Sequence, residues 1–387
     1  MILLCILLLL AAMPAPAGAP ENPATVSQQM STAERLNRPG WWPRKGTFAR
    51  DDYVGPAQCT ACHKSLADTQ KNSAMARTSS PASESPNLIA AEAKPFTLGA
   101  FTYKIQPSFG SIANSVSVGG ASISEPLGWA FGSDKVGQTY VFEKDGRFFE
   151  SAFSYFTALH GFDGTPGLNL LPSQDSLQEN LRKGAGRPLT NELARGCFGC
   201  HNTAAETGGN FDREHLIPNV TCEACHGPGA NHVALQRSGL EAGGGLIFNP
   251  KHLSPIESVD FCGSCHRTWW DVMLTEEVGV STILAAPYRL VKSRCWGNGD
   301  ARLTCVACHN PHEPLVHDPA AYDQRCLNCH TLKAVSQTAN QHPGTSCPVG
   351  VNQCVTCHMP KYEVPDMHYR FTDHMIRIVK TDAAFPN

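Results

Sequence analysis

The most informative feature of this 387-residue chain is the five-residue pattern C-x-x-C-H, which occurs seven times. No C-x-x-C pair in the sequence lacks the histidine. In this pattern two thiols can add across the vinyl groups of a haem, and the next residue supplies an imidazole to the iron. Zinc is the competing interpretation, because paired C-x-x-C units also form tetrahedral zinc sites. Those sites do not need an adjacent histidine, so repetition at every position favours c-type haem.

The motif predicts seven covalently bound haems, each with one iron and one proximal histidine. The haem-attaching thiols are Cys59, Cys62, Cys197, Cys200, Cys222, Cys225, Cys262, Cys265, Cys305, Cys308, Cys326, Cys329, Cys354 and Cys357. The proximal ligands are His63, His201, His226, His266, His309, His330 and His358. Three cysteines remain: Cys5, Cys295 and Cys347. Cys295 and Cys347 could form one disulfide, which the sequence leaves open because it depends on geometry.

Nine further histidines are available as second axial ligands. A haem iron with two protein ligands is suited to electron transfer, whereas an open position can bind water or substrate. We expect distal ligands among His232, His312 and His374 first, then His342 and His368, then His160. His215, His252 and His317 lie in polar stretches and are not expected to bind iron. Met75 is the best sulfur candidate, although a methionine packed on a porphyrin is an equally good interpretation.

The motif spacing and composition predict a mainly α fold with extensive loops, wrapped around the haems. Six motifs lie between Cys197 and His358, which leaves room for one short helix and a connection each. The first motif stands apart, and residues 78–95 have the Ser/Pro/Ala-rich composition of a linker. Alternating residues at 101–105 predict a half-buried strand, and 139–143 and 147–151 flank a turn typical of a hairpin. We therefore expect a small β-rich insert at 96–157, or a loop insertion without a binding role.

The N-terminal residues indicate export. An apolar run near the start, followed by an A-x-A pattern, predicts a signal peptide over 1–17, although no Lys or Arg precedes the run. No other stretch has transmembrane length, so we expect an exported, periplasmic or extracellular protein. The expected divisions are 18–95 with the first haem, the insert at 96–157, and a six-haem domain at 158–387. The formal net charge is −3, so the chain lacks the excess of basic residues that is typical of nucleic-acid-binding proteins.

Residues 220–229 with His232, together with 305–312, 354–360 and 371–374, carry a resemblance. They resemble multihaem c-type cytochromes related to the tetrahaem electron acceptor of hydroxylamine oxidoreductase and to exported cytochromes of unknown role. The resemblance covers residues 53–380 and implies stacked and perpendicular porphyrin pairs with mostly His/His ligation. At 72–77, where many relatives carry a histidine, this chain has Met75 instead.

Three functions are compatible with these residues. The first is an electron-transfer protein that exchanges electrons with redox partner proteins. The second is a reductase of a small nitrogen or sulfur oxyanion at one open haem, which would need proton donors and cationic groups beside the iron. The third is a subunit of a larger redox complex or filament. The available second ligands favour the carrier, because no catalytic constellation is evident in the sequence.

Overall fold

The computed structural model describes residues 48–386, except 93, 134, 173–175, 208–209, 240–246, 297–299, 301, 331–345 and 381–383. The predicted signal peptide, Cys5 and His342 lie outside the described residues. No helix in the described part has the length and apolar character that a membrane span requires.

The expectation of a mainly α fold is wrong. Of the described residues, 37% are helical and 24% lie in strands, which form several antiparallel sheets. The physical reason is the segment between the first two motifs, where aromatic and β-branched residues favour strands. This segment builds its own hydrophobic core from residues such as Phe101, Tyr103 and Tyr140.

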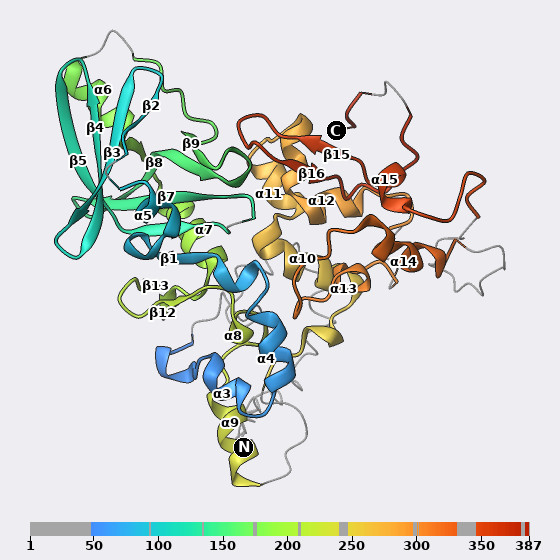
Figure 1. The fold of residues 1–387 in the computed structure, drawn as a ribbon. Coiled ribbons are helices and arrows are strands. Elements are labelled where there is room, and N and C mark those ends of the chain that lie inside the picture. Colours follow the sequence, from blue (N-terminus) through green and yellow to red (C-terminus); the bar gives the residue numbers. More distant parts are fainter. Residues whose placement is uncertain are drawn as a thin grey trace, which may run out of the picture.

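The strands of this segment form two sheets that we call the β-domain, residues 79–188 (Figure 1, upper left). The larger sheet has the order β1-β6-β7-β8-β10, with β9 also paired to β8. The smaller sheet has the order β2-β3-β4-β5. The strands are β1 (Ser79–Pro81), β2 (Phe96–Leu98), β3 (Phe101–Ser108), β4 (Ser111–Val118), β5 (Ala121–Leu127), β6 (Trp129–Phe131), β7 (Gly137–Lys144), β8 (Arg147–Phe156), β9 (Gly161–Gly164) and β10 (Gly186–Pro188). The β-rich region therefore extends beyond 96–157 on both sides.

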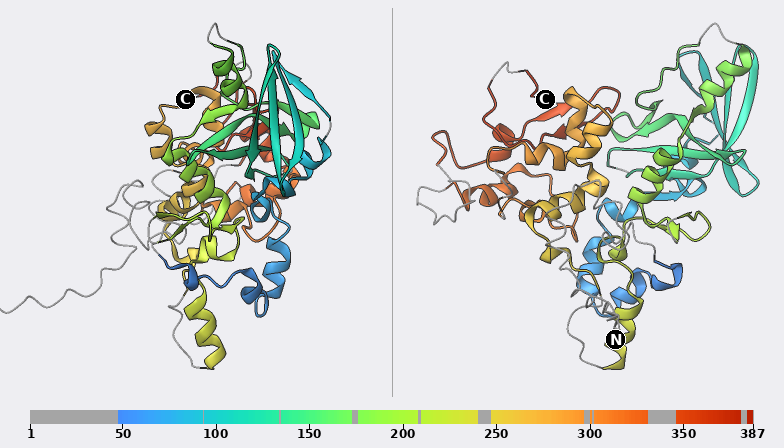
Figure 2. Two further views of the ribbon diagram at one scale, coloured as in Figure 1. Left: turned by 90° about the vertical axis from the view of Figure 1, so that its left-hand side faces the viewer. Right: turned by 180° about the vertical axis from the view of Figure 1, so that it is seen from behind.

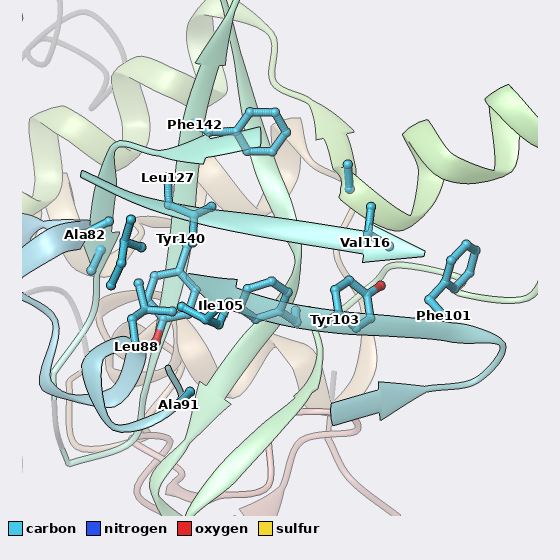
Figure 3. Packing of buried hydrophobic residues seen from close by; sticks show 14 residues of the cluster. Ala82, Leu88, Ala91, Phe101, Tyr103, Ile105, Val116, Leu127, Tyr140 and Phe142 are labelled. Carbon is cyan, nitrogen blue, oxygen red and sulfur yellow. The ribbon is translucent and has the colours of Figure 1, made fainter. Parts of the chain in front are cut away.

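The two local predictions within the β-domain are confirmed. Strand β3 alternates as expected, with the side chains of Phe101, Tyr103 and Ile105 completely buried (Figure 3). Strands β7 and β8 form the hairpin, joined by Asp145 and Gly146, which both have positive φ. Such a two-residue turn matches the twist of the strands that it connects.

The interpretation of residues 78–95 as a linker is wrong. The segment contains β1, a 3-10 turn at Ala82–Glu84 and helix α5 (Pro86–Ala90). Ala82 and Leu88 are fully buried in the core that both sheets share (Figure 3). The Ser/Pro/Ala-rich composition predicts a linker, but small residues such as Ala82 also allow this segment to pack closely against the core of the β-domain. Helix α6 (Leu177–Ala185), near the C-terminal end of the β-domain, covers β4 and β5.

The haem motifs lie on short helices outside the β-domain. The helices that carry a motif are α3 (Pro56–Thr60), α7 (Asn191–His201), α8 (Cys222–His226), α10 (Pro255–His266), α13 (Cys305–Cys308), α14 (Asp323–Leu327) and α15 (Cys354–His358). Four further helices lie between them: α4 (Lys64–Gln70), α9 (Ala230–Ser238), α11 (Trp269–Leu274) and α12 (Ala286–Val291). Small two-stranded sheets join them: β11 (Asn202–Ala204) with β14 (Ile217–Pro218), β12 (Glu206–Thr207) with β13 (Asn210–Phe211), and β15 (Lys361–Glu363) with β16 (Arg370–Thr372).

The described chain has three arms. Figure 1 shows the β-domain on one side, α3, α4 and α9 at the bottom, and α13 to α15 on the opposite side. The same arms are seen from behind in Figure 2. Helices α7, α8 and α10 lie where the arms meet, so the motif helices are distributed across the whole molecule.

Candidate haem sites

Each of the seven motifs begins in a helix. The first cysteine is in α3, α7, α8, α10, α13, α14 or α15, and the histidine ends that helix or follows it closely. Residues at i, i+3 and i+4 lie on one face of a helix. Each C-x-x-C-H therefore presents two thiols and one imidazole toward the same side, as attachment of one flat ligand requires. Good caps support the longer helices: Thr190 caps α7, and Ser254 forms a capping box with Glu257 at the start of α10.

Three motif histidines face a second histidine from elsewhere in the chain. His63 faces His232, with ring centroids 6.5 Å apart and an interplanar angle of 21°. His226 faces His312 at 6.1 Å and 9°. His309 faces His374 at 6.2 Å and 48°. Each second histidine belongs to a different segment from the motif it faces, so these pairs are tertiary features.

The separation of these rings fits a metal between them. An imidazole nitrogen binds a metal ion at about 2 Å and lies about 1 Å from the ring centre, so two imidazoles on opposite sides of one ion have centroids about 6 Å apart. Rings in direct contact would be closer. The three pairs therefore have the chemistry and the spacing that a haem iron with two axial histidines requires.

Hydrogen bonds to backbone carbonyls orient three of the imidazoles. Nδ1 of His226 lies 2.9 Å from the carbonyl oxygen of Phe248, Nδ1 of His358 lies 2.9 Å from that of Arg377, and Nδ1 of His374 lies 3.1 Å from that of Thr372. A ring that donates from Nδ1 leaves Nε2 free to bind metal. Burial, and then the neighbouring His309, lower the pKa of His374 to about 4, which keeps this imidazole in its neutral, metal-binding form.

Cysteines from different motifs hydrogen-bond to one another. Cys59 of the first motif pairs with Cys222 of the third, which raises the pKa of Cys59 and lowers that of Cys222 to about 7. Cys262 of the fourth motif pairs in the same way with Cys305 of the fifth. These contacts bring the attachment edges of two motifs together in each case.

The sixth and seventh motifs form a third such pair. Burial and the nearby Cys354 raise the pKa of Cys326 to about 12, and the two thiols share a hydrogen bond. Asp323 of α14 also accepts hydrogen bonds from the backbone amides of Gln353, at 2.6 Å, and Cys354, at 2.8 Å. The start of α15 is therefore fixed to the helix of the preceding motif.

The second motif packs against the β-domain. Phe198 of α7 is fully buried among aromatic side chains, and Cys197 packs against the same cluster. The ring of Phe131 lies 5.5 Å from that of His201, and burial lowers the pKa of His201. The hydroxyl of Thr78 donates a 2.8 Å hydrogen bond to the carbonyl of His201. The β-domain thus supplies an apolar wall to one haem motif.

Comparison with known proteins agrees with this chemistry. Residues 170–227, which contain the second and third motifs, match the family "Cytochrome c554 and c-prime". Together with the motifs, this match supports a multihaem c-type cytochrome. None of the curated proteins matches the chain. A solved structure, the outer cell wall cytochrome OcwA, is similar to it with a TM-score of 0.48 and 14% sequence identity, over 84% of this chain and 80% of that one.

The other candidate distal ligands do not face a motif histidine in the described residues. Nε2 of His368 lies 2.8 Å from a carboxylate oxygen of Asp163, and its ring packs on Phe156 of the β-domain. His160 is exposed, with a left-handed backbone. The half-buried Met75 accepts a backbone hydrogen bond from Val220. The remaining histidines, His215, His252 and His317, are exposed.

The two cysteines outside the motifs that the structure describes, Cys295 and Cys347, are both free thiols. Cys295 is partly buried and lies close enough to Cys308 and Cys329 for electrostatic interaction with both. Cys347 is also free, and backbone amides of Val349 and Gly350 lower its pKa. The disulfide that the sequence left open is therefore not the arrangement found.

Sequence reasoning missed two buried acidic residues that organise the site. Glu223, inside the third motif, accepts three backbone hydrogen bonds. Asp373, directly before His374, forms a fully buried ion pair with Arg289. Acidic side chains are almost never fully buried unless they are paired, so each buried acid marks a position where the surrounding structure stabilises a carboxylate. In the sequence each acid directly adjoins a residue expected to hold a haem: Glu223 adjoins Cys222, and Asp373 adjoins His374. The C-x-x-C-H pattern itself assigns no role to such an acid.

Proposed function

We propose that the chain is a heptahaem c-type cytochrome that carries electrons along its covalently bound haems, in the periplasm or outside the cell. The observation that carries the proposal is the set of three facing imidazole pairs, His63 with His232, His226 with His312, and His309 with His374. Each pair would hold one haem iron between its two imidazoles. Such a site exchanges electrons and has no open position for a substrate.

In this proposal the chain's residues have separate roles. The seven cysteine pairs attach the haems, and the motif histidines provide the proximal ligands. His232, His312 and His374 are the second ligands of the first, third and fifth haems. When bound, haem supplies an iron that cycles between the ferric and ferrous states. Apolar walls such as that of Phe131 and Phe198 limit solvent near the metal, which affects its potential.

Contacts between motifs support a continuous route rather than isolated haems. The thiol pairs join the first motif to the third, the fourth to the fifth, and the sixth to the seventh. Electrostatic interactions also link Cys225 to Cys262 and Cys308 to Cys326. Since attachment edges that touch place their haems side by side, electrons can pass through the motifs in the order one, three, four, five, six and seven. The second motif lies beside the fourth, because His201 interacts with Cys265 and His266.

Low-temperature electron paramagnetic resonance (EPR) of the oxidised protein tests this function. We expect low-spin signals from most irons, including at least three with two axial histidines. The intact mass should exceed that of the apoprotein by seven haems, and haem stain should survive denaturing electrophoresis. A mass with fewer haems would remove a motif from the proposal. A dominant high-spin signal in the fully loaded protein would instead favour the reductase.

A further inference from the structure

Glu223 is a buried acid that joins two distant parts of the chain. Its side chain is 1% exposed. Oε1 accepts hydrogen bonds from the backbone amides of Val54, at 2.9 Å, and Gly229, at 2.8 Å, and Oε2 accepts one from Gly55 at 2.8 Å. A carboxylate that is removed from water needs such donors, because an unpaired buried charge is strongly unfavourable. Here three backbone amides satisfy it.

The amides that Glu223 binds lie at the starts of two helices. Gly55 is the N-cap residue of α3, and Gly229 is the N-cap residue of α9. Unpaired amides and the helix dipole make both positions favourable for a carboxylate. Helix α3 leads to Cys59 and His63, whereas His232 lies in the first turn of α9. The Glu223 side chain therefore holds together the starts of α3 and α9, the two segments that carry the facing imidazoles of His63 and His232.

The packing around this carboxylate leaves little freedom. A Cβ on Gly229 would lie 3.1 Å from a methyl of Val54 and 3.3 Å from Oε1 of Glu223, closer than ordinary contact. Gly55 has φ +77°, a conformation that favours glycine. The backbone of Glu223 is also held, because its carbonyl accepts a 3.0 Å bond from Gly227. The carboxylate is thus held by close contacts on the side of Gly229 and by the backbone of its own helix.

We propose that Glu223 is a positioning residue for the axial ligands of the first haem: by binding the starts of α3 and α9 together, it sets the spacing and the relative angle of the His63 and His232 rings. This inference rests on the proposed function, because it assumes that the two imidazoles share one iron. Glu223 itself touches neither imidazole in this arrangement. It acts through the two helices, and its effect falls on the first haem.

The test uses the full-length, haem-loaded protein and the variants Glu223→Gln, Glu257→Gln and His232→Ala. Glutamine keeps the shape of the side chain and one acceptor oxygen, but its amide group would face the Gly55 amide donor to donor. The start of α3 should therefore move relative to α9. Glu257 is the matched control: it is also 1% exposed on a motif helix, but its carboxylate binds Ser254 at the start of its own helix.

The readout is the low-spin signal of the first haem, identified as the signal that His232→Ala removes. The angle between axial imidazole planes governs the anisotropy of such a signal. We expect Glu223→Gln to keep seven haems by mass and to shift this one signal, or convert part of it to high spin. Glu257→Gln should leave it in place.

Three results would overturn the inference. If Glu223→Gln leaves the first-haem signal unchanged while His232→Ala removes it, Glu223 does not position the ligands, and the electron-carrier proposal stands. If Glu223→Gln has only six haems, the residue is needed for attachment instead. If His232→Ala removes no low-spin signal, the ligand assignment fails, and the inference about Glu223 fails with it.

Discussion

Replacement of Arg289 by methionine should destabilise the C-terminal part of the chain. Arg289 of α12 and Asp373 are both 0% exposed, and Nε and Nη2 of the arginine each donate a 2.9 Å bond to the carboxylate. Nη1 donates a third bond, of 2.7 Å, to the carbonyl of Pro386. The guanidinium also lies 4.5 Å from the ring centroid of Phe385. Methionine would preserve most of the length and volume but none of these hydrogen bonds.

The loss in the free energy of unfolding depends on which partners the Asp373 carboxylate keeps in the variant. Breaking a buried ion pair by removing one partner typically costs about 3–5 kcal/mol, because the other charge is left uncompensated. Here Asp373 would keep a 2.5 Å bond from Arg377 and a 3.0 Å bond from the backbone amide of Met375. We therefore expect the free energy of unfolding of Arg289→Met to fall by an amount near the lower limit of this range, about 3 kcal/mol. Burial alone would raise the pKa of Asp373, but its hydrogen bonds with Arg289 first, and then with Met375 and Arg377, lower that pKa and so favour the charged form.

Guanidinium unfolding followed by circular dichroism measures this loss. The control is Arg182→Met, which removes an ion pair with Glu179 whose side chains are 68% and 55% exposed. Pairs of this kind contribute little, so the control should unfold at the parent's midpoint. If Arg289→Met also unfolds there, the Arg289–Asp373 pair is hydrated in solution, and the reasoning from burial is refuted.

Three further outcomes are expected. His374→Ala should keep all seven attachments and convert one iron to a high-spin form that binds carbon monoxide, because the ring of His374 faces that of His309; an unchanged low-spin count by EPR would remove His374 as a ligand. Gly184→Ala should lower the free energy of unfolding by about 1–3 kcal/mol, since the new Cβ would lie 2.5 Å from the Phe101 ring; equal stability in guanidinium unfolding would mean that the ring can move aside. Steady-state assays should show negligible turnover of nitrite, hydroxylamine or tetrathionate, and reduction of any of them at tens per second, an ordinary enzymatic rate, would favour the reductase.

The local geometry of the motifs could be predicted from the sequence because it depends on spacing over a few residues. A helix places residues i, i+3 and i+4 on one face, so C-x-x-C-H specifies its own geometry at each site. The β3 strand and the hairpin at Asp145–Gly146 were predictable for the same reason, since alternation and turn residues act over a few positions. The extent of the β-domain was not predictable in this way. Leu88 joins its core from a segment whose composition indicates a linker, and only tertiary packing shows this.

Distal ligands depend on contacts that spacing cannot specify. His232 and His368 are both histidines close to a motif in sequence, yet the structure places one against His63 and the other against Asp163 of the β-domain. The difference arises from what holds each segment. Helix α9 begins at a turn that Glu223 fixes, whereas His368 lies in a connection with positive φ that leads to the β-domain contact.

The position of the β-domain explains how the first motif stays with the others. The segment that leads into the domain runs beside residues that follow the second motif: Gln70 donates a 2.8 Å bond to the carbonyl of Val220, and Val220 donates a 3.0 Å bond to that of Met75. Ser79 and Asn219 exchange two further bonds, each involving a side chain. The domain is therefore an insertion into a scaffold whose two sides remain hydrogen-bonded. For this reason Cys59 can touch Cys222, although the whole β-domain separates them in the sequence.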